Sequence, residues 1–298
     1  MHQPTRRSFL KSTAAAAALA SPLNGVAFAA DADAKGPWLK KAVKYSMIQH
    51  KGSVLDKFEL AKKCGFLGLE MDSPSNVDVN EANAAQKKTG VVIHGVIDSI
   101  HWNQRLSDPD PAVRDKGLQG LLTALKDAHT YGADTCLLVP GAVRDKEKES
   151  FEQAWERYTE QVKKAIPTAE KLGVKICIET VWNEFITTPE HLIKYVDQFQ
   201  NPIVGAYFDI SNMIKYGVPP ADWIRRLGKR LYKFDFKGYS KAKGFGVQIG
   251  EGDENWPEVL KALKEVGYSG WATSEVKGGG EEWLMEVSKR MSEVLGLA

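Results

Sequence analysis

Four acidic residues each follow an apolar or β-branched run in the second half of the chain, where strands are expected to end. They are Glu179 in KICIET, Asp209 in VGAYFDI, Asp235 in LYKFDFKG and Glu275 in GWATSEV. An unpaired carboxylate is costly in such a buried setting. A divalent cation is the usual means of holding several carboxylates together away from bulk water. The pattern therefore predicts a shared metal site, with chemistry on a ligand that the metal binds.

The elements that would position these acids are eight short β-rich runs separated by longer segments of helical periodicity. The runs cover residues 43–49, 66–72, 91–98, 135–141, 175–180, 204–210, 231–238 and 270–276. Gly65, Gly90 and Gly173 each end a helical segment just before a strand. Eight alternations of strand and helix predict a parallel sheet that closes into a (β/α)8 TIM barrel. A doubly wound open sheet is the alternative, which the lack of a glycine-rich loop after the first strand disfavours.

The predicted metal site and the predicted barrel fold are consistent with each other. In a TIM barrel the carboxyl ends of the strands carry the active site, and all four acids are expected there. No break in composition or linker interrupts the chain from residue 43 onward. We therefore predict one barrel domain over residues 43–298, preceded by a lead-in or tether over residues 30–42.

The first 29 residues have the features of a twin-arginine signal peptide. Arg6 and Arg7 precede an alanine-rich run, and Ala27-Phe28-Ala29 offers a small-residue cleavage site. The alternative is an amphipathic first helix of the domain. The apolar run is too short for a convincing membrane anchor, so no stable membrane insertion is expected. The signal predicts export of the folded protein to the periplasm or the exterior.

The charge balance argues against a polyanionic partner. The chain has 40 basic and 38 acidic residues, and three of the basic ones lie in the signal. The remainder, with 37 basic and 38 acidic residues, has a formal charge of −1. This balance predicts no nucleic-acid partner. The three cysteines, an odd number, are expected to be buried thiols.

Three long segments resemble the xylose-isomerase-like TIM barrel superfamily, specifically its sugar phosphate isomerases and epimerases. They read IETVWNEFITTPEHL, YFDISNMIKYGVPPADWIRRLG and IGEGDENWPEVLKALKEVGYSGWATSE. The resemblance extends over all eight predicted strands. It implies one divalent cation that is bound by Glu, Asp, His and Glu side chains. Mn²⁺ and Mg²⁺ are the cations expected. By position these ligands become Glu179, Asp209, the Asp235 site and Glu275.

The third ligand departs from the family pattern. The family usually has His-x-Lys-Asp at the end of strand seven, whereas this chain has Asp235-Phe236-Lys237-Gly238. If Asp235 binds, the site is all-oxygen and favours Mg²⁺, Mn²⁺ or Ca²⁺ over Zn²⁺. Lys237 would offset part of the negative charge. The alternative is a site that has lost its metal and pairs Asp235 with a lysine.

The resemblance implies a metal-dependent isomerase or epimerase that acts on a small-molecule carbohydrate by proton transfer next to a carbonyl. Glu179 and Glu275 would be the acid/base groups, with Asp209 and Asp235 principally ligands. One alternative is a lyase or hydratase acting on 3-keto-glycosides on the same barrel. Another is a sugar-binding barrel without catalysis. The oligomeric state stays open, and a homo-oligomer is compatible with the sequence.

Five further residues are expected to contact the substrate: His94, Trp102, Asn183, Asn212 and Lys237. His94 is placed close to the barrel mouth, with an interior histidine as the alternative. Trp102 would stack on a sugar ring or simply cover the barrel, and Asn183 would line the pocket or lie in a solvated loop. Asn212 matches a family Asp-x-x-His/Asn pattern.

A glycine run, Lys277–Gly280, precedes the last helical segment. Barrels often bind phosphate at such a place, but tight turning explains the glycines equally well. Export also argues against a phosphorylated sugar.

Overall fold

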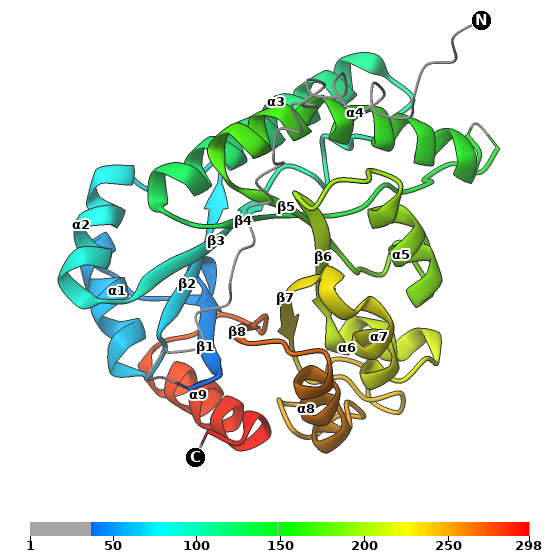
Figure 1. The fold of residues 1–298 in the computed structure, drawn as a ribbon. Coiled ribbons are helices and arrows are strands. Elements are labelled where there is room, and N and C mark those ends of the chain that lie inside the picture. The colour runs from blue at the N-terminus through cyan, green and yellow to red at the C-terminus, as the bar shows by residue number, and fades with distance from the viewer. Residues whose placement is uncertain (1–36, 148, 298) are drawn as a thin grey trace, which may run out of the picture. The chain divides into compact units, whose positions relative to one another are not determined.

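Eight parallel strands pair in sequence order and close into a barrel in the computed structural model (Figure 1). The structure describes residues 37–147 and 149–297, so the predicted signal peptide and residues 30–36 of the predicted lead-in lie outside it. The predicted TIM barrel is confirmed. Among the described residues, no helix is long and apolar enough to cross a membrane.

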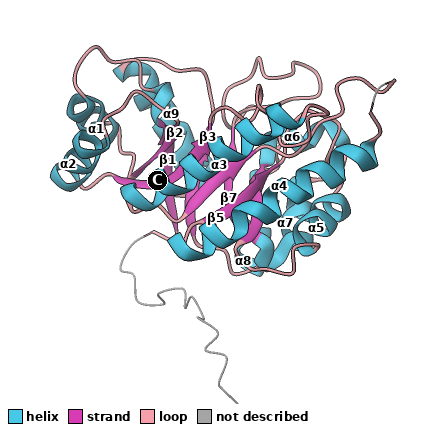
Figure 2. Cartoon of the chain, turned by 90° about the horizontal axis from the view of Figure 1, so that it is seen from above, coloured by secondary structure: helices cyan, strands magenta, loops and turns pink. Residues whose placement is uncertain are grey.

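The strands and helices alternate around the barrel. The strands are β1 (Leu39–Lys44), β2 (Gly68–Ser73), β3 (Val92–Asp98), β4 (Thr135–Leu138), β5 (Lys175–Glu179), β6 (Val204–Asp209), β7 (Leu231–Phe236) and β8 (Gly270–Ser274). The helices are α1 (Val54–Lys63), α2 (Val79–Thr89), α3 (Pro111–Tyr131), α4 (Phe151–Leu172), α5 (Pro189–Asp197), α6 (Ile210–Met213), α7 (Pro220–Leu227), α8 (Trp256–Glu265) and α9 (Glu281–Leu295). Figure 2 shows the helices arranged around the strands.

The first strand begins earlier than predicted. The sequence indicated a strand over 43–49, but β1 covers Leu39–Lys44 and a 3-10 turn follows at Tyr45–Met47. Residues 39–43 pair with β8, so residues 39–42 are part of the barrel and not of a lead-in. Two successive lysines in this strand obscured it, because they interrupt the apolar pattern.

Local sequence signals account for the helix boundaries. Ser53 caps α1 through a reciprocal capping box with Asp56. Gly90 and Gly173 end α2 and α4 in the left-handed conformation, as their positions before strands predicted. The buried faces of these helices join the apolar core that surrounds the barrel. The helices therefore cover the outside of the barrel, and loops follow the carboxyl ends of the strands.

One extra helical turn follows the carboxyl end of β6. The side chain of Asp209 accepts a hydrogen bond from the backbone N–H of Asn212 at 2.8 Å and so begins α6 directly after the strand. This turn keeps Asn212 buried beside the strand end.

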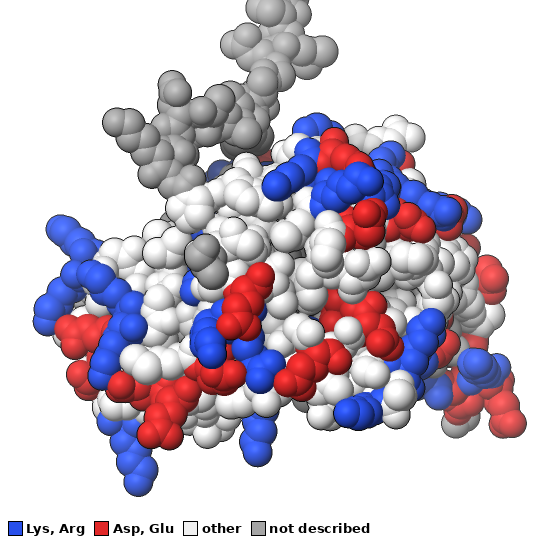
Figure 3. All heavy atoms as spheres, turned by 90° about the horizontal axis from the view of Figure 1, so that it is seen from below, with Lys and Arg blue, Asp and Glu red and all other residues white. Residues whose placement is uncertain are grey.

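Charged side chains of both signs are interspersed over the face shown in Figure 3, with uncharged areas between them. Within the described residues on this face, basic side chains form no continuous surface, in keeping with the near-neutral composition.

Candidate active site

The four acids predicted from the sequence come together at the carboxyl end of the barrel. Glu179, Asp209, Asp235 and Glu275 each offer an oxygen within 4.8 Å of those of the others. Asp209 pairs in register with Asp235 across β6 and β7, which sets their side chains next to each other. Three of the four are buried, whereas the Glu275 side chain is 34% exposed. Glu275 is therefore the one carboxylate of the cluster with a substantially exposed side chain.

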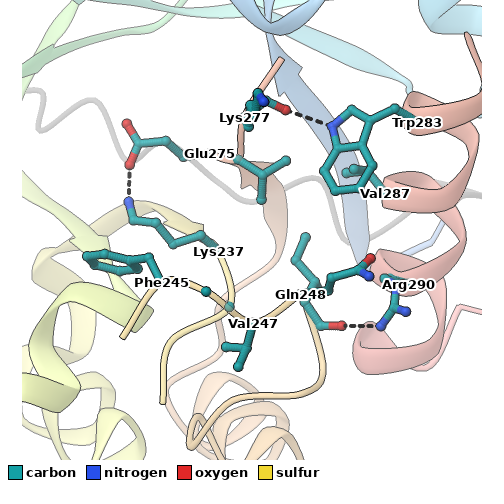
Figure 4. A pocket seen from close by; sticks show the side chains of 13 residues that line it. Lys237, Phe245, Val247, Gln248, Glu275, Lys277, Trp283, Val287 and Arg290 are labelled. Atoms are coloured by element: carbon teal, nitrogen blue, oxygen red, sulfur yellow. Dashed lines mark hydrogen bonds and ion pairs between the residues drawn. The ribbon is translucent and has the colours of Figure 1, made fainter. Parts of the chain in front are cut away.

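Two lysines lie among these carboxylates. Lys44, at the end of β1, places its Nζ 2.5 Å from Glu275 Oε1 and 3.1 Å from Asp235 Oδ2. Lys237 Nζ lies 2.6 Å from Asp209 Oδ2 and also pairs with Glu275, as Figure 4 shows. Lys44 was not among the residues predicted from the sequence. It lies at the end of β1, whereas the strand predicted over 43–49 put Lys44 near the start of the strand.

The protonation of the cluster is uneven. Burial raises the pKa of Asp209 to about 7, and burial with the neighbouring Asp235 carboxylate raises the pKa of Glu179 well above its ordinary value. Burial acts in the same direction on Glu275, but the ammonium groups of Lys44 and Lys237 outweigh it and lower the pKa of Glu275 to about 2. In its effect on the pKa, burial therefore outweighs the lysines at Asp209 and Glu179, whereas the lysines outweigh burial at Glu275.

The chemistry of this cluster fits a divalent cation. Neither oxygen of the buried Asp235 side chain has a hydrogen-bond partner, although Lys44 lies nearby. When all four carboxyl groups are ionised, as metal ligands are, four carboxylates against two ammonium groups leave two negative charges, which one dication would balance. All four donors are oxygens, the ligands that hard cations prefer.

A cavity of about 490 Å³ lies over the cluster, with Glu179, Glu275, Lys44 and Lys237 in its wall. Its rim carries three exposed aromatic side chains, Trp102, Trp182 and Phe245. Exposed aromatic faces at the mouth of a polar cavity suit the apolar faces of sugar rings.

His101 also lines this cavity. Its Nδ1 accepts a hydrogen bond from the backbone N–H of Val139 at 3.3 Å, which assigns the ring proton to Nε2. Burial lowers the pKa of His101 to about 3, so the ring is neutral near pH 7. A neutral imidazole at this place can donate a hydrogen bond to a hydroxyl or carbonyl oxygen of a ligand. Like Lys44, this residue was not among the predicted contacts.

Three of the five predicted substrate contacts lie in the cavity wall: Trp102, Asn212 and Lys237. Asn212 is held by a hydrogen bond from its Nδ2 to the carbonyl oxygen of Thr180 at 3.1 Å. Its backbone oxygen accepts from Trp182 Nε1 at 2.6 Å. Asn212 thus connects the ends of β5 and β6 and supports the aromatic rim.

The predicted placement of His94 near the mouth is wrong. His94 is 2% exposed inside the barrel and stacks on Trp271 with ring centroids 4.7 Å apart. Lys233 Nζ donates to its carbonyl oxygen at 3.0 Å, and its Nε2 lies 3.3 Å from Thr273 Oγ1. The cause is its position in the strand, since His94 lies four residues before the end of β3 and therefore points into a deeper layer.

Asn183 also differs from the prediction. Its Nδ2 donates to the carbonyl oxygens of Pro140 and Gly141, at 3.3 and 2.9 Å, and its Oδ1 accepts from the Phe185 N–H. These bonds join the loops after β4 and β5, and Asn183 is not in the wall of the cavity over the carboxylates. It shapes a loop instead of facing the site.

Residues 58–294 match the family described as "Xylose isomerase-like TIM barrel". This match spans most of the described barrel. The chain belongs to this family. Residues 3–21 match the twin-arginine translocation pathway signal sequence, in agreement with the predicted export signal.

Relatives of this chain include sugar epimerases. The chain is 26% identical over 266 residues to the D-psicose 3-epimerase of Ruminiclostridium cellulolyticum, covering 81% of this chain and 86% of the relative. It is 23% identical to an L-ribulose-5-phosphate 3-epimerase of Escherichia coli, covering 72% and 79%. The fold is shared with the E. coli 3-keto-D-glucoside 4-epimerase at a TM-score of 0.74 and 16% identity, covering 86% of this chain and 98% of that one. These relatives agree with the predicted isomerase and epimerase class.

Proposed function

We propose that this protein is a divalent-metal-dependent sugar epimerase or isomerase that moves a proton at a carbon next to a carbonyl. The observation that carries the proposal is the cluster of four carboxylate oxygens within 4.8 Å of one another, at the base of a cavity with an aromatic rim. Membership of the xylose isomerase-like family and the epimerase relatives support the same reaction class.

Glu179, Asp209, Asp235 and Glu275 would hold the cation. When bound, it would supply Lewis-acid polarisation of the sugar carbonyl and an adjacent hydroxyl. The all-oxygen ligand set supports Mn²⁺ or Mg²⁺. The export signal supports a site of action in the periplasm or outside the cell, and an unphosphorylated sugar or derivative.

The acid/base work falls to two of the carboxylates. Glu275, the carboxylate of the cluster that is partly exposed to the cavity, removes the proton from the carbon next to the carbonyl. Glu179, which also lines the cavity, returns a proton to the same carbon in an epimerisation or to the neighbouring carbon in an isomerisation. The roles exchange in the reverse direction, and the sugar keeps its mass throughout.

Other residues of the chain bind and orient the sugar. The neutral imidazole of His101 donates to a sugar oxygen, and Trp102 covers one ring face from the rim. Lys237 keeps Asp209 and Glu275 in place and neutralises part of their charge.

Proton exchange tests the proposal directly. The protein is incubated in D₂O with Mn²⁺ or Mg²⁺ and a panel of ketoses, and NMR follows deuterium at the carbon next to the carbonyl together with the appearance of an epimer. We expect exchange that disappears with EDTA and returns with the cation. Glu179→Gln and Glu275→Gln should each lower turnover by about 10²-fold or more, the usual size of an acid/base contribution. Glu265→Gln, on the outer helix α8, is the control that should leave turnover unchanged.

Mass spectrometry of the products separates the alternatives. An epimer or isomer retains the mass of the substrate, whereas a lyase or hydratase acting on a 3-keto-glycoside changes it. Tight binding of sugars without exchange, after the cation has been restored, would indicate a binding protein. Full turnover in either glutamine variant would refute the acid/base assignment.

A further inference from the structure

A second cavity adjoins the one over the carboxylates. It has a volume of about 430 Å³ and lies between the loop after β7 and helix α9. Three residues line both cavities: Lys237, Phe245 and Glu275. In Figure 4 Glu275 and Lys237 lie on one side of this cavity, with Trp283 and Val287 of α9 across from them. A ligand that contacts Glu275 therefore has a second compartment directly beside it.

We propose that the substrate has two units: a sugar that carries the reacting carbonyl over the carboxylates, and a neutral glycosyl unit joined to it that occupies this second cavity. The inference rests on the proposed function and adds the substrate class. Each cavity falls within the roughly 300–1,000 Å³ of ordinary small-molecule sites, so each can hold a ring.

The lining of the second cavity suits the two faces of a sugar ring. Trp283 Nε1 donates to the carbonyl oxygen of Lys277 at 2.7 Å, which holds the indole in one orientation. Val287 is buried beside it, and Phe245 provides a further aromatic face at the boundary with the first cavity. Flat apolar side chains of this kind pack against the C–H face of a pyranose.

An unsatisfied acceptor points to a hydroxyl donor. Gln248 lines the second cavity, and its buried Oε1 has no hydrogen-bond partner. Buried polar atoms are nearly always paired, so a turn of the Gln248 side chain that brings this oxygen into the cavity would be stabilised by a hydroxyl donor there. Sugar hydroxyls are such donors.

The charges of this cavity favour a neutral occupant over a phosphate. Three basic side chains line it: Arg290 is bound by Glu286 at 2.7 Å and Glu251 at 3.0 Å, Lys237 is bound by Asp209 and Glu275, and Lys277 is the third. Arg290 also donates to the carbonyl oxygen of Ile249 at 3.2 Å. A phosphate would have to displace these carboxylates, whereas a neutral ring leaves them in place.

A series of ketoses that differ only by the second unit tests this inference. The probes are D-fructose, the glucosyl-fructose isomers turanose, maltulose, leucrose and isomaltulose, and fructose 6-phosphate. Isothermal titration calorimetry measures their binding to the full protein with Mn²⁺ present. Because the isomers attach glucose at different fructose oxygens, they sample the directions in which a second ring can leave the first cavity.

We expect at least one disaccharide to bind about 10-fold more tightly than fructose. Trp283→Ala and Gln248→Ala should remove that gain and leave fructose binding unchanged. Met285→Ala is the matched control, because Met285 is an exposed apolar residue of the same helix that does not line the cavity. Thermal unfolding of each variant establishes that it is folded.

Four outcomes overturn the inference. The first is that no disaccharide gains over fructose, and the second is that the Trp283 variant weakens fructose and disaccharides alike. The third is that fructose 6-phosphate binds more tightly than every disaccharide, which would assign the cavity to a phosphate. The last is that no probe binds and none exchanges protons, a result that contradicts the proposed function itself.

Discussion

Asp235 is the residue that most distinguishes this site. It lies fully buried beside Asp209, and neither of its oxygens accepts a hydrogen bond. Lys44 Nζ lies 3.1 Å from Asp235 Oδ2 and forms an ion pair with it. Compared with the imidazole that the family resemblance implies at this position, a carboxylate adds a negative charge to the cluster, and Lys44 of β1 offsets it. The two residues are best understood together.

Replacing Lys44 tests this pairing. In Lys44→Met the ammonium that would repel a bound dication is gone, while the side chain keeps much of its length. We expect the dissociation constant for Mn²⁺, measured by calorimetry, to fall about 10-fold or more, an effect comparable to that of one nearby charge on a pKa. Lys40→Met is the control on the same strand, where the lysine lies over Trp271 instead. Weaker Mn²⁺ binding in Lys44→Met would show that the ammonium orders the carboxylates and does not compete with the cation.

At the scale of elements, side chains from different strands pack against one another in the interior of the barrel, below the carboxylates. Trp271 of β8 packs across the interior against His94 of β3, and the first residue of β2 is a glycine that makes room for it. A Cβ at Gly68 would lie 2.4 Å from Trp271 Cζ3. At the base of the barrel the large side chain of Trp271 therefore fills the space that Gly68, which has no side chain, leaves open.

Gly68→Ala should destabilise the barrel without touching the carboxylates. Overpacking of this kind commonly costs about 1–3 kcal/mol, which chemical denaturation will measure. Gly280→Ala is the control, because its φ is −81° and the nearest atom to a new Cβ is 4.0 Å away. A Gly68→Ala protein as stable as the parent would mean that Trp271 has space to move.

At the scale of the whole molecule, the barrel carries buried acids that the reaction does not use. Glu70 is fully buried on β2, and its Oε2 accepts from Tyr207 Oη at 3.2 Å. Burial raises the pKa of Glu70 from 4.5 to about 7, against the opposing effect of Lys44. Between pH 4.5 and about 7 the Glu70 carboxyl group is therefore protonated in the folded protein and ionised in the unfolded chain. Stability from this group is present at low pH and is lost as the pH rises toward 7.

Glu70→Gln isolates this contribution, because glutamine cannot ionise. Relative to the parent, the variant should gain stability between pH 4.5 and 7.5, by about 3 kcal/mol at most from the pKa difference. Thermal and urea unfolding at several pH values measure the gain. Glu59→Gln, at a half-exposed position, should follow the parent across this range. Parallel pH profiles for Glu70→Gln and the parent would contradict the raised pKa.

The sequence by itself determined the alternation of eight strands with helices and the four acids at one end of the barrel. Both follow from local patterns, since apolar periodicity, helix-ending glycines and charged residues at strand ends act within one element. Only the tertiary structure decided that Lys44 joins the acids, that His94 lies in a deeper layer and that Asn183 turns into a loop. It also decided that two cavities share Glu275. These features depend on strand register and loop course, which set the side chains that meet across the barrel and are not encoded in any single segment.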